Sequence, residues 1–264
     1  MSIIGKVDSL WRYPVKSMRG EELHEAFASY SGIYGDRVFA FRTSANHSGF
    51  PYFTAREQRR FLQYRPQFRY PDKAARPINL VEAESRNANP LLANLAELIV
   101  DVETPDGKSL AIDDPALIEM LRANVDQKHQ VTLMQSQRAM TDCRPVSLFS
   151  LQSAQQLAEE TGIPVDKRRF RANVYADFGS AAKGFAENEL VDRSIRIGSK
   201  VVITILERDA RCVVITLDPD SGEQTPAILK KVAQAHDGMA GVYGAVVVEG
   251  LIQKGDSIEL LESA

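Results

Sequence analysis

The chain has 264 residues, 44% of them hydrophobic, which is long enough for one large domain or two closely packed ones, each with its own core. Its 32 Lys and Arg residues against 35 Asp and Glu residues leave a net charge of −3, which excludes a chain-wide basic field for nucleic acid or an anionic membrane. The start lacks a basic segment before a long apolar run, and no later stretch approaches the roughly 20 apolar residues of a membrane span. We therefore expect a cytoplasmic protein with no nucleic-acid or membrane partner.

Short strands dominate the first half of the chain. Alternating apolar and polar side chains predict a strand over residues 3–13, which ends at Pro14. Asp114 before Pro115 predicts the capped start of a short helix. Turn residues around apolar runs predict further strands over residues 23–28, 38–43, 78–82, 98–103 and 108–112.

The second half continues this pattern with few helices. Helices are expected over about residues 152–160 and 225–235. Strands are predicted over residues 131–134, 146–149, 195–197, 201–206, 213–217, 242–249 and 258–261. Such dense strands, without regular alternation of strand and helix, predict a mainly β fold with a few helices, as a β or α+β arrangement of barrels or sandwiches.

The cysteines Cys143 and Cys212 lie far apart and fit no zinc spacing, so any cysteine chemistry involves a single thiolate. Cys212 follows a predicted strand and has Arg208 and Arg211 close by in sequence. Neighbouring positive charge favours the thiolate, the form of the thiol that binds metals. The apolar residues 213–215 equally fit an ordinary buried cysteine. Cys143 is interpreted as structural.

Two segments of the first half carry candidate anion-binding side chains. Lys16 and Ser17 follow a strand that ends at a proline, where a turn presents an ammonium and a hydroxyl. Arg37 lies at a strand start after Asp36, where its planar fork of donors suits an anion. The simpler alternatives are a solvated lysine in a turn and a surface ion pair between Asp36 and Arg37.

A third basic segment, residues 167–173, leads into a short predicted strand. Alternation would place Arg169, Arg171 and Asn173 on one face, and Arg171 with Asn173 suits a small anion better than nucleic acid. Arg56 is a weaker candidate, because the charged residues after it are typical of the solvent side of a helix.

Four ordered motifs bring these candidates together. They are Tyr13-Pro14-Val15-Lys16-Ser17, Gly35-Asp36-Arg37, Arg169-Phe170-Arg171-Ala172-Asn173, and Arg211-Cys212 followed by Asp218-Pro219-Asp220-Ser221-Gly222. In combination they resemble the MOSC family, the group similar to the molybdenum cofactor sulfurase C-terminal domain and the mitochondrial amidoxime reducing component. The resemblance covers nearly the whole chain and implies two closely packed β-barrel-like domains, a MOSC N-terminal barrel over residues 1–122 and a MOSC β-barrel over residues 123–264.

The same resemblance implies a molybdenum cofactor in a basic cleft between the two domains. It assigns Lys16, Ser17 and Arg37 to the phosphate end, Arg171 and Asn173 to the pterin, Cys212 to molybdenum as its thiolate ligand and the catalytic residue, and Ser150 to the pocket as a further candidate. Asp209 is a candidate proton relay from its nearness to Cys212 in the sequence alone. The family is also associated with pyridoxal phosphate binding.

The activity implied is reduction of N-hydroxylated compounds, such as hydroxylamines and amidoximes, by removal of the oxygen atom. Because the motifs include no ferredoxin-like domain, electrons are expected from a separate ferredoxin, flavodoxin or cytochrome-type donor with its reductase. We expect a monomer. The sequence departs from the family pattern at Met18, Ala172 and Ala240, where cysteine, proline and phenylalanine are common, which affects the expected shape of the pocket.

Two other functions fit the same residues. In the first, Cys212 carries a persulfide, and the protein is a sulfur carrier in the assembly of metal–sulfur centres. In the second, the arginines bind a phosphorylated ligand in a non-enzymatic module, and Cys212 belongs to the core.

Overall fold

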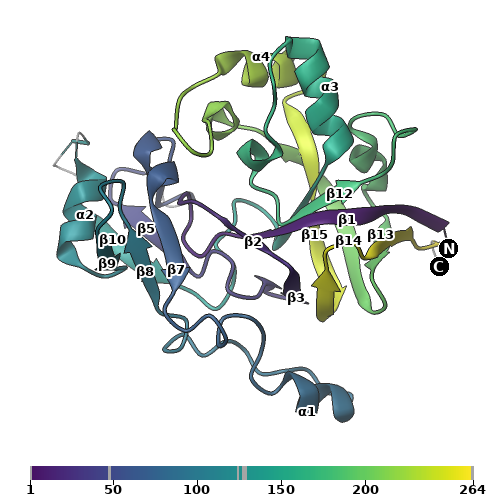
Figure 1. The fold of residues 1–264 in the computed structure, drawn as a ribbon, viewed down its shortest axis with the longest axis horizontal. Helices are drawn as coiled ribbons and strands as arrows, with labels where there is room; N and C mark the ends of the chain where they lie inside the picture. Colours follow the sequence, from purple (N-terminus) through teal and green to yellow (C-terminus); the bar gives the residue numbers. More distant parts are fainter. Residues whose placement is uncertain (1, 47–48, 124, 127–129, 263–264) are drawn as a thin grey trace.

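A closed β-barrel lies on the right in Figure 1 and takes strands from both ends of the chain. The computed structural model describes residues 2–46, 49–123, 125–126 and 130–262. Within these residues, seven strands form the barrel in the order β12, β11, β15, β14, β13, β17 and β1, and pairing of β1 with β12 closes it. Their bounds are Ser2–Arg12 for β1, Val146–Ser150 for β11, Val174–Asp177 for β12, Ser194–Ile197 for β13, Val201–Ala210 for β14, Met239–Val248 for β15 and Ser257–Leu260 for β17.

Alternation along the barrel strands directs apolar side chains into a common interior. Val7 and Leu10 of β1 pack with Ile195 of β13 and Ile203 of β14 in this core. Strands β11 and β12 pair in parallel, which requires a crossover connection between them. Helix α3 (Leu151–Thr161) lies in that crossover, and the chain then returns through the 3₁₀ helix η2 (Lys167–Phe170). The crossover thereby brings the basic segment of η2 to the end of the barrel.

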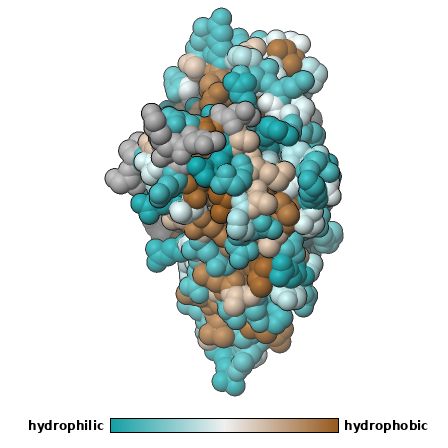
Figure 2. All heavy atoms as spheres, turned by 90° about the vertical axis from the view of Figure 1, so that its left-hand side faces the viewer, coloured by the Kyte–Doolittle hydropathy of each residue, from teal (hydrophilic) through white to brown (hydrophobic). Residues whose placement is uncertain are grey.

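Residues 39–135 supply the strands of a second β-rich unit, on the left in Figure 1. One sheet has the order β10, β5 and β6, and another has the order β7, β8 and β9. Their bounds are Phe39–Thr43 for β5, Tyr52–Phe53 for β6, Arg65–Phe68 for β7, Val100–Glu103 for β8, Ser109–Ala111 for β9 and Val131–Gln135 for β10. Phe41, Phe53, Phe61 and Leu117 form part of its core. Figure 2, which faces this unit, shows polar surface interrupted by apolar patches.

Smaller elements complete the two units. Strand β2 (Glu21–Leu23) pairs with β1, and β3 (Glu25–Ser29) lies between β4 (Gly32–Ile33) and β16 (Gly250–Gln253). The remaining helices are α1 (Leu80–Ser85), α2 (Pro115–Arg122), α4 (Pro226–Ala235) and the 3₁₀ helices η1 (Arg59–Gln63), η3 (Ala186–Leu190) and η4 (Val213–Thr216). No helix in the described ranges is long and apolar enough to cross a membrane.

The structure confirms the mainly β fold and the capped start of α2, where the Asp114 side chain accepts from the backbone N–H of Ala116 at 2.8 Å. The division between residues 1–122 and 123–264 stays a prediction. Strand β1 forms part of the barrel built mainly from the second half of the chain.

Two predicted strands are helical instead. Residues 78–82 fall at the start of α1, where Leu80 and Ala83 are buried while Val81 is 77% exposed, a spacing typical of a helix. Residues 213–217 fall largely in η4. Short apolar runs do not distinguish strand from helix, and neither described segment pairs with a strand apart from an isolated bridge between Leu217 and Gln224.

The alternation predicted through residues 169–173 is also wrong. Arg169 lies in η2, and Arg171 follows it with a left-handed backbone, so the two side chains and Asn173 do not share one face of a strand. The turn after η2 sends the arginines toward the cavity described below, while Asn173 stays within the barrel wall.

Candidate functional site

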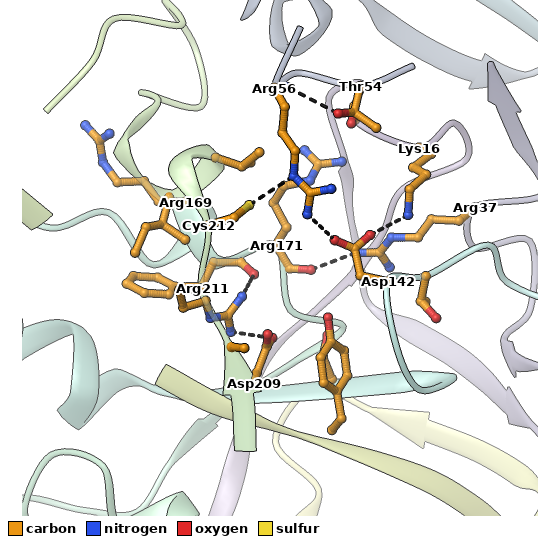
Figure 3. A pocket seen from close by; sticks show the side chains of 18 of the residues that line it. Lys16, Arg37, Thr54, Arg56, Asp142, Arg169, Arg171, Asp209, Arg211 and Cys212 are labelled. Carbon is orange, nitrogen blue, oxygen red and sulfur yellow. Dashed lines mark hydrogen bonds and ion pairs between the residues drawn. The ribbon is translucent and has the colours of Figure 1, made fainter. Parts of the chain in front are cut away.

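A strongly basic cavity is lined by residues of both units (Figure 3). Among the described residues, six cationic side chains line it, against two carboxylates. The cations are Lys16, Arg37, Arg56, Arg169, Arg171 and Arg211, and the carboxylates are Asp142 and Asp209. Ser17 and Cys212 also line the cavity. This excess of positive charge favours an anionic ligand.

Lys16 is held in this cavity by hydrogen bonds at both ends. Its backbone N–H donates to Phe39 O at 2.8 Å, and its ammonium donates to Met140 O at 2.8 Å and to Asp142 Oδ1 at 2.5 Å. The ammonium also lies 4.5 Å from the centre of the Tyr52 ring. Burial lowers the pKa of Lys16 to about 8, although Asp142 opposes the shift. Lys16 is therefore a poorly hydrated cation that an incoming anion can solvate.

Ser17, Arg37 and Arg171 share an unusual backbone conformation. Their φ angles are 70°, 45° and 53°, in the left-handed region that residues with a Cβ seldom adopt. Arg37 Nη2 donates to Arg171 O at 2.9 Å, and Arg171 Nη2 donates to Met18 O at 2.8 Å. The three segments that carry these residues are thus joined by hydrogen bonds, and backbone strain of this kind is concentrated at ligand sites.

Arg37 and Arg171 differ in their electrostatic surroundings. Both guanidiniums lie beside the Tyr13 ring, 4.6 and 4.3 Å from its centre. Burial acts to lower the pKa of Arg37, but the adjacent Asp36 carboxylate outweighs it and holds that pKa above its usual value. Burial lowers the pKa of Arg171 to about 10, with a further contribution from Arg37 and opposition from Tyr13. Arg171 is consequently the less stabilised of the two charges.

Cys212 lies just before η4, and Arg56 links it to the cations of the first half (Figure 3). Arg56 Nε donates to Cys212 Sγ at 3.4 Å, and Arg56 Nη2 donates to Asp142 Oδ2 at 2.9 Å. The guanidinium of Arg56 also lies 4.3 Å from the centre of the Phe50 ring. Lys16, Asp142, Arg56 and Cys212 therefore form one continuous chain of polar contacts across the cavity.

The sequence prediction undervalued Arg56. Thr54 donates two hydrogen bonds to the Glu57 carboxylate, since its hydroxyl and its backbone N–H both donate to Glu57 Oε2 at 2.8 Å. This turn directs Arg56 into the cavity rather than along the solvent side of a helix. The spacing Thr54-x-x-Glu57 is the available sequence signal, because it is typical of a capping box. Asp142 is not predicted as a site residue from the sequence, because no capping or binding motif surrounds it.

Arg169 from η2 and Arg211, the residue before Cys212, also line the cavity. Arg169 Nη1 donates to Thr216 O at 2.8 Å, whereas its buried Nε has no hydrogen-bond partner among the described residues. Arg211 Nη1 donates to Phe170 O at 2.9 Å. A Cβ atom on Gly241 would lie 2.9 Å from Arg211 Nη2, so the absence of a side chain there makes room for the guanidinium. The open donor of Arg169 suits an anionic ligand.

Two predicted site residues lie away from the cavity lining. Asn173 is 1% exposed, and its Oδ1 accepts from Ser147 N at 3.2 Å while its Nδ2 donates to Trp11 O at 3.3 Å. Ser150 caps α3 and donates to buried Glu187 at 2.7 Å. Cys143, interpreted as structural, is exposed beside Asp142.

Replacing Ser150 with alanine is expected to lower the free energy of unfolding by about 1–3 kcal/mol, through loss of the α3 cap and of a hydrogen bond to buried Glu187. Urea denaturation measures the change. The control is Ser85→Ala at an exposed position of α1, for which we expect a change within about 0.5 kcal/mol. A Ser150→Ala protein of unchanged stability would contradict this structural role.

The chain is similar, at low sequence identity, to several solved structures. The crystal structure of the YuaD protein from Bacillus subtilis matches with a TM-score of 0.48 and 13% identity, covering 98% of this chain and 97% of that chain. YiiM from Geobacillus stearothermophilus matches with a TM-score of 0.36 and 18% identity over 45% of this chain and 55% of that chain. YiiM from Escherichia coli matches with a TM-score of 0.34 and 16% identity over 46% and 56%, respectively. No curated protein matches the chain significantly.

Two family models account for most of the sequence. The MOSC N-terminal beta barrel domain matches residues 4–164, and the MOSC domain matches residues 135–259. The MOSC domain is associated in general with molybdenum cofactor binding, and its proteins are often molybdenum-related enzymes. Because the two overlapping models together span residues 4–259, the chain belongs to the MOSC family.

Proposed function

We propose that the basic cavity binds the molybdenum cofactor and that the protein reduces N-hydroxylated compounds. The observation that carries the proposal is the combination, in one cavity, of a cysteine sulfur with six cationic side chains. A phosphorylated pterin with a metal centre needs both features, since the phosphate requires donors and a soft metal site accepts thiolate. The buried Nε of Arg169, without a partner among the described residues, is a donor still available to such a ligand.

The residues of the cavity divide between the two ends of the cofactor. Lys16, Ser17 and Arg171 would hold the anionic end, where an ammonium, a hydroxyl and a guanidinium line the cavity. Cys212 would provide the thiolate ligand to molybdenum, and Arg56 would orient its sulfur through the contact at 3.4 Å. Arg37, already paired with Asp36, would hold Arg171 in position by donating to its backbone carbonyl.

When bound, the cofactor supplies two-electron redox chemistry at a metal. The overall reaction would convert R–NHOH, two electrons and two protons into R–NH₂ and water. The chain's own contribution is to bind and orient the reactants and to manage charge and protons around them. The electrons would come from a separate redox protein.

Metal and pterin analysis tests the proposal directly. Protein purified from cells with intact cofactor synthesis is expected to contain molybdenum and phosphorylated pterin near one per chain, and to reduce an aryl amidoxime with a reduced viologen as donor. The double variant Lys16→Gln with Arg171→Gln is expected to lose at least about 100-fold in cofactor affinity, because each of the two lost charge-assisted bonds contributes about 1.5–3 kcal/mol. Arg86→Gln, at an exposed ion pair of α1, is the control.

The position of the Cys212 sulfur on the cavity also suits a sulfur carrier, the second candidate function. In that case the purified protein would carry labile sulfane sulfur and no pterin. Molybdenum-free and pterin-free protein from cells that load other molybdoenzymes would contradict the proposed reductase.

A further inference from the structure

Two carboxylates line the cavity in opposite electrostatic surroundings. Asp142 lies between Lys16 Nζ at 2.5 Å and Arg56 Nη2 at 2.9 Å. Burial acts to raise the pKa of Asp142, but these two cations outweigh it and hold that pKa below its usual value. Asp209 is 3% exposed, and burial raises its pKa to about 6 although Arg211 opposes the shift. When the surroundings shift the pKa values of two carboxyl groups in one site in opposite directions, the group with the higher pKa is suited to carry a proton.

The contacts of Arg211 show why its positive charge does not fully compensate Asp209. Arg211 Nη2 lies 2.7 Å from Asp209 Oδ2, as an ion pair without the geometry of a hydrogen bond. The other nitrogens of Arg211 donate to backbone, Nε to Ala240 O at 2.5 Å and Nη1 to Phe170 O at 2.9 Å. Arg211 is therefore shared between Asp209 and two carbonyls.

Three further titratable groups act on Asp209 from other segments. Tyr243 on β15 hydrogen-bonds its carboxylate and favours the ionised form. Arg37 also favours the ionised form, whereas Asp142 disfavours it. Asp209 itself lies near the end of β14, three positions before Cys212, and both line the same cavity (Figure 3).

The proposed reaction needs an acid at this place. Breaking the N–O bond of a hydroxylamine or amidoxime without protonation would release hydroxide, a poor leaving group in a low-dielectric cavity. Lys16 is unsuited, because its ammonium is engaged by Asp142 and Met140 O, and guanidinium groups hold their protons too firmly. A neutral carboxylic acid within reach of the reacting atoms is the appropriate donor.

We propose that Asp209 is the proton donor to the oxygen that leaves the N-hydroxylated substrate, an assignment that rests on the function proposed above. The Asp209 O–H bond breaks as a new O–H bond forms on the departing hydroxyl, and the N–O bond cleaves as two electrons arrive from the external donor. A second proton, from solvent, completes the amine. Arg211 and Tyr243 stabilise the resulting Asp209 carboxylate until solvent reprotonates it.

Asp209→Asn in the cofactor-loaded full chain is expected to lower kcat for amidoxime reduction by at least about 100-fold, with molybdenum content unchanged. Asp209→Glu is expected to recover part of the rate. Since only protonated Asp209 donates, the wild-type kcat should fall as pH rises above about 6, and the asparagine variant should lack this limb. The control is Asp237→Asn, an exposed carboxylate paired with Arg208, which should match wild type.

Tyr243→Phe separates a proton-donor role from a structural one. Loss of the tyrosine hydrogen bond destabilises the Asp209 carboxylate, so its pKa rises and the falling limb moves to higher pH. The same upward shift is expected in the titration of the Asp209 carboxyl carbon, followed by carbon-13 NMR in the cofactor-free full chain. This second readout does not depend on turnover.

The outcomes distinguish this assignment from the proposed function. If wild-type protein reduces amidoximes and Asp209→Asn keeps both the rate and the pH limb, Asp209 is not the donor, while the reductase function stands. Loss of molybdenum from Asp209→Asn, or a carboxyl titration near the ordinary value of about 4, would also overturn the assignment. A loaded wild-type protein that reduces no N-hydroxylated compound overturns both proposals.

Discussion

Cys212→Ser is expected to abolish retention of molybdenum and to lower amidoxime reduction by more than about 100-fold. The hydroxyl oxygen is a harder ligand than thiolate and is not ionised at neutral pH, so it would bind a soft metal site poorly. Loss of a group that supports a metal ligand lowers metal affinity or activity by about 10- to 100-fold, and loss of a direct ligand should lower them further. Metal content per chain and the rate with a viologen donor measure the two effects.

The matched control for this change is Cys143→Ser. Cys143 is an exposed cysteine next to Asp142 in sequence, but it does not line the cavity. We expect its replacement to leave both molybdenum content and turnover within about 2-fold of wild type, in keeping with a surface substitution. Normal turnover by Cys212→Ser would show that Cys212 is not the ligand.

Asp36→Ala is expected to destabilise the fold by about 3–5 kcal/mol, the usual cost of leaving one member of a buried ion pair uncompensated. Asp36 is 1% exposed, and it accepts from Tyr13 N at 2.8 Å and from Arg37 Nη1 at 2.5 Å. Its removal leaves the buried Arg37 guanidinium without its carboxylate, next to Arg171. Urea denaturation gives the free energy of unfolding.

Glu82→Ala is the control for Asp36→Ala. Glu82 pairs with Arg86 on α1, where the two side chains are 59% and 73% exposed, so we expect a change below about 0.5 kcal/mol. A destabilisation by Asp36→Ala no larger than that of Glu82→Ala would show that the pair in the cavity wall is not a structural requirement.

Much of the fold is predictable where one physical signal dominates. The alternation in β1 and the Asp114-Pro115 cap of α2 are both local, and the structure agrees with them. The segments at α1 and η4 were mispredicted because their apolar runs are short, and the position of neighbouring elements decides their conformation. Closure of the barrel through β1 and β12 joins residues more than 160 positions apart, which no local pattern specifies.

The site was predictable in part, as residue types rather than as an arrangement. Lys16, Ser17, Arg37, Arg171 and Cys212 were singled out in the sequence, and the structure brings all five to one cavity. Whether they bind the cofactor remains a prediction. Ser150 and Asn173 were predicted as binding residues too, but their polar groups form hydrogen bonds within the barrel wall.

The sequence by itself determined that positive charge recurs in four ordered segments and that the last of them carries the candidate thiolate Cys212, because residue identity and spacing suffice for that. Only the tertiary structure decided which charges act on one another. It directed Arg56 onto the Cys212 sulfur, placed Asp142 between Lys16 and Arg56, and buried Asp209 beside Arg211. Electrostatic effects depend on distance and burial, which are properties of the folded chain and not of the order of its residues.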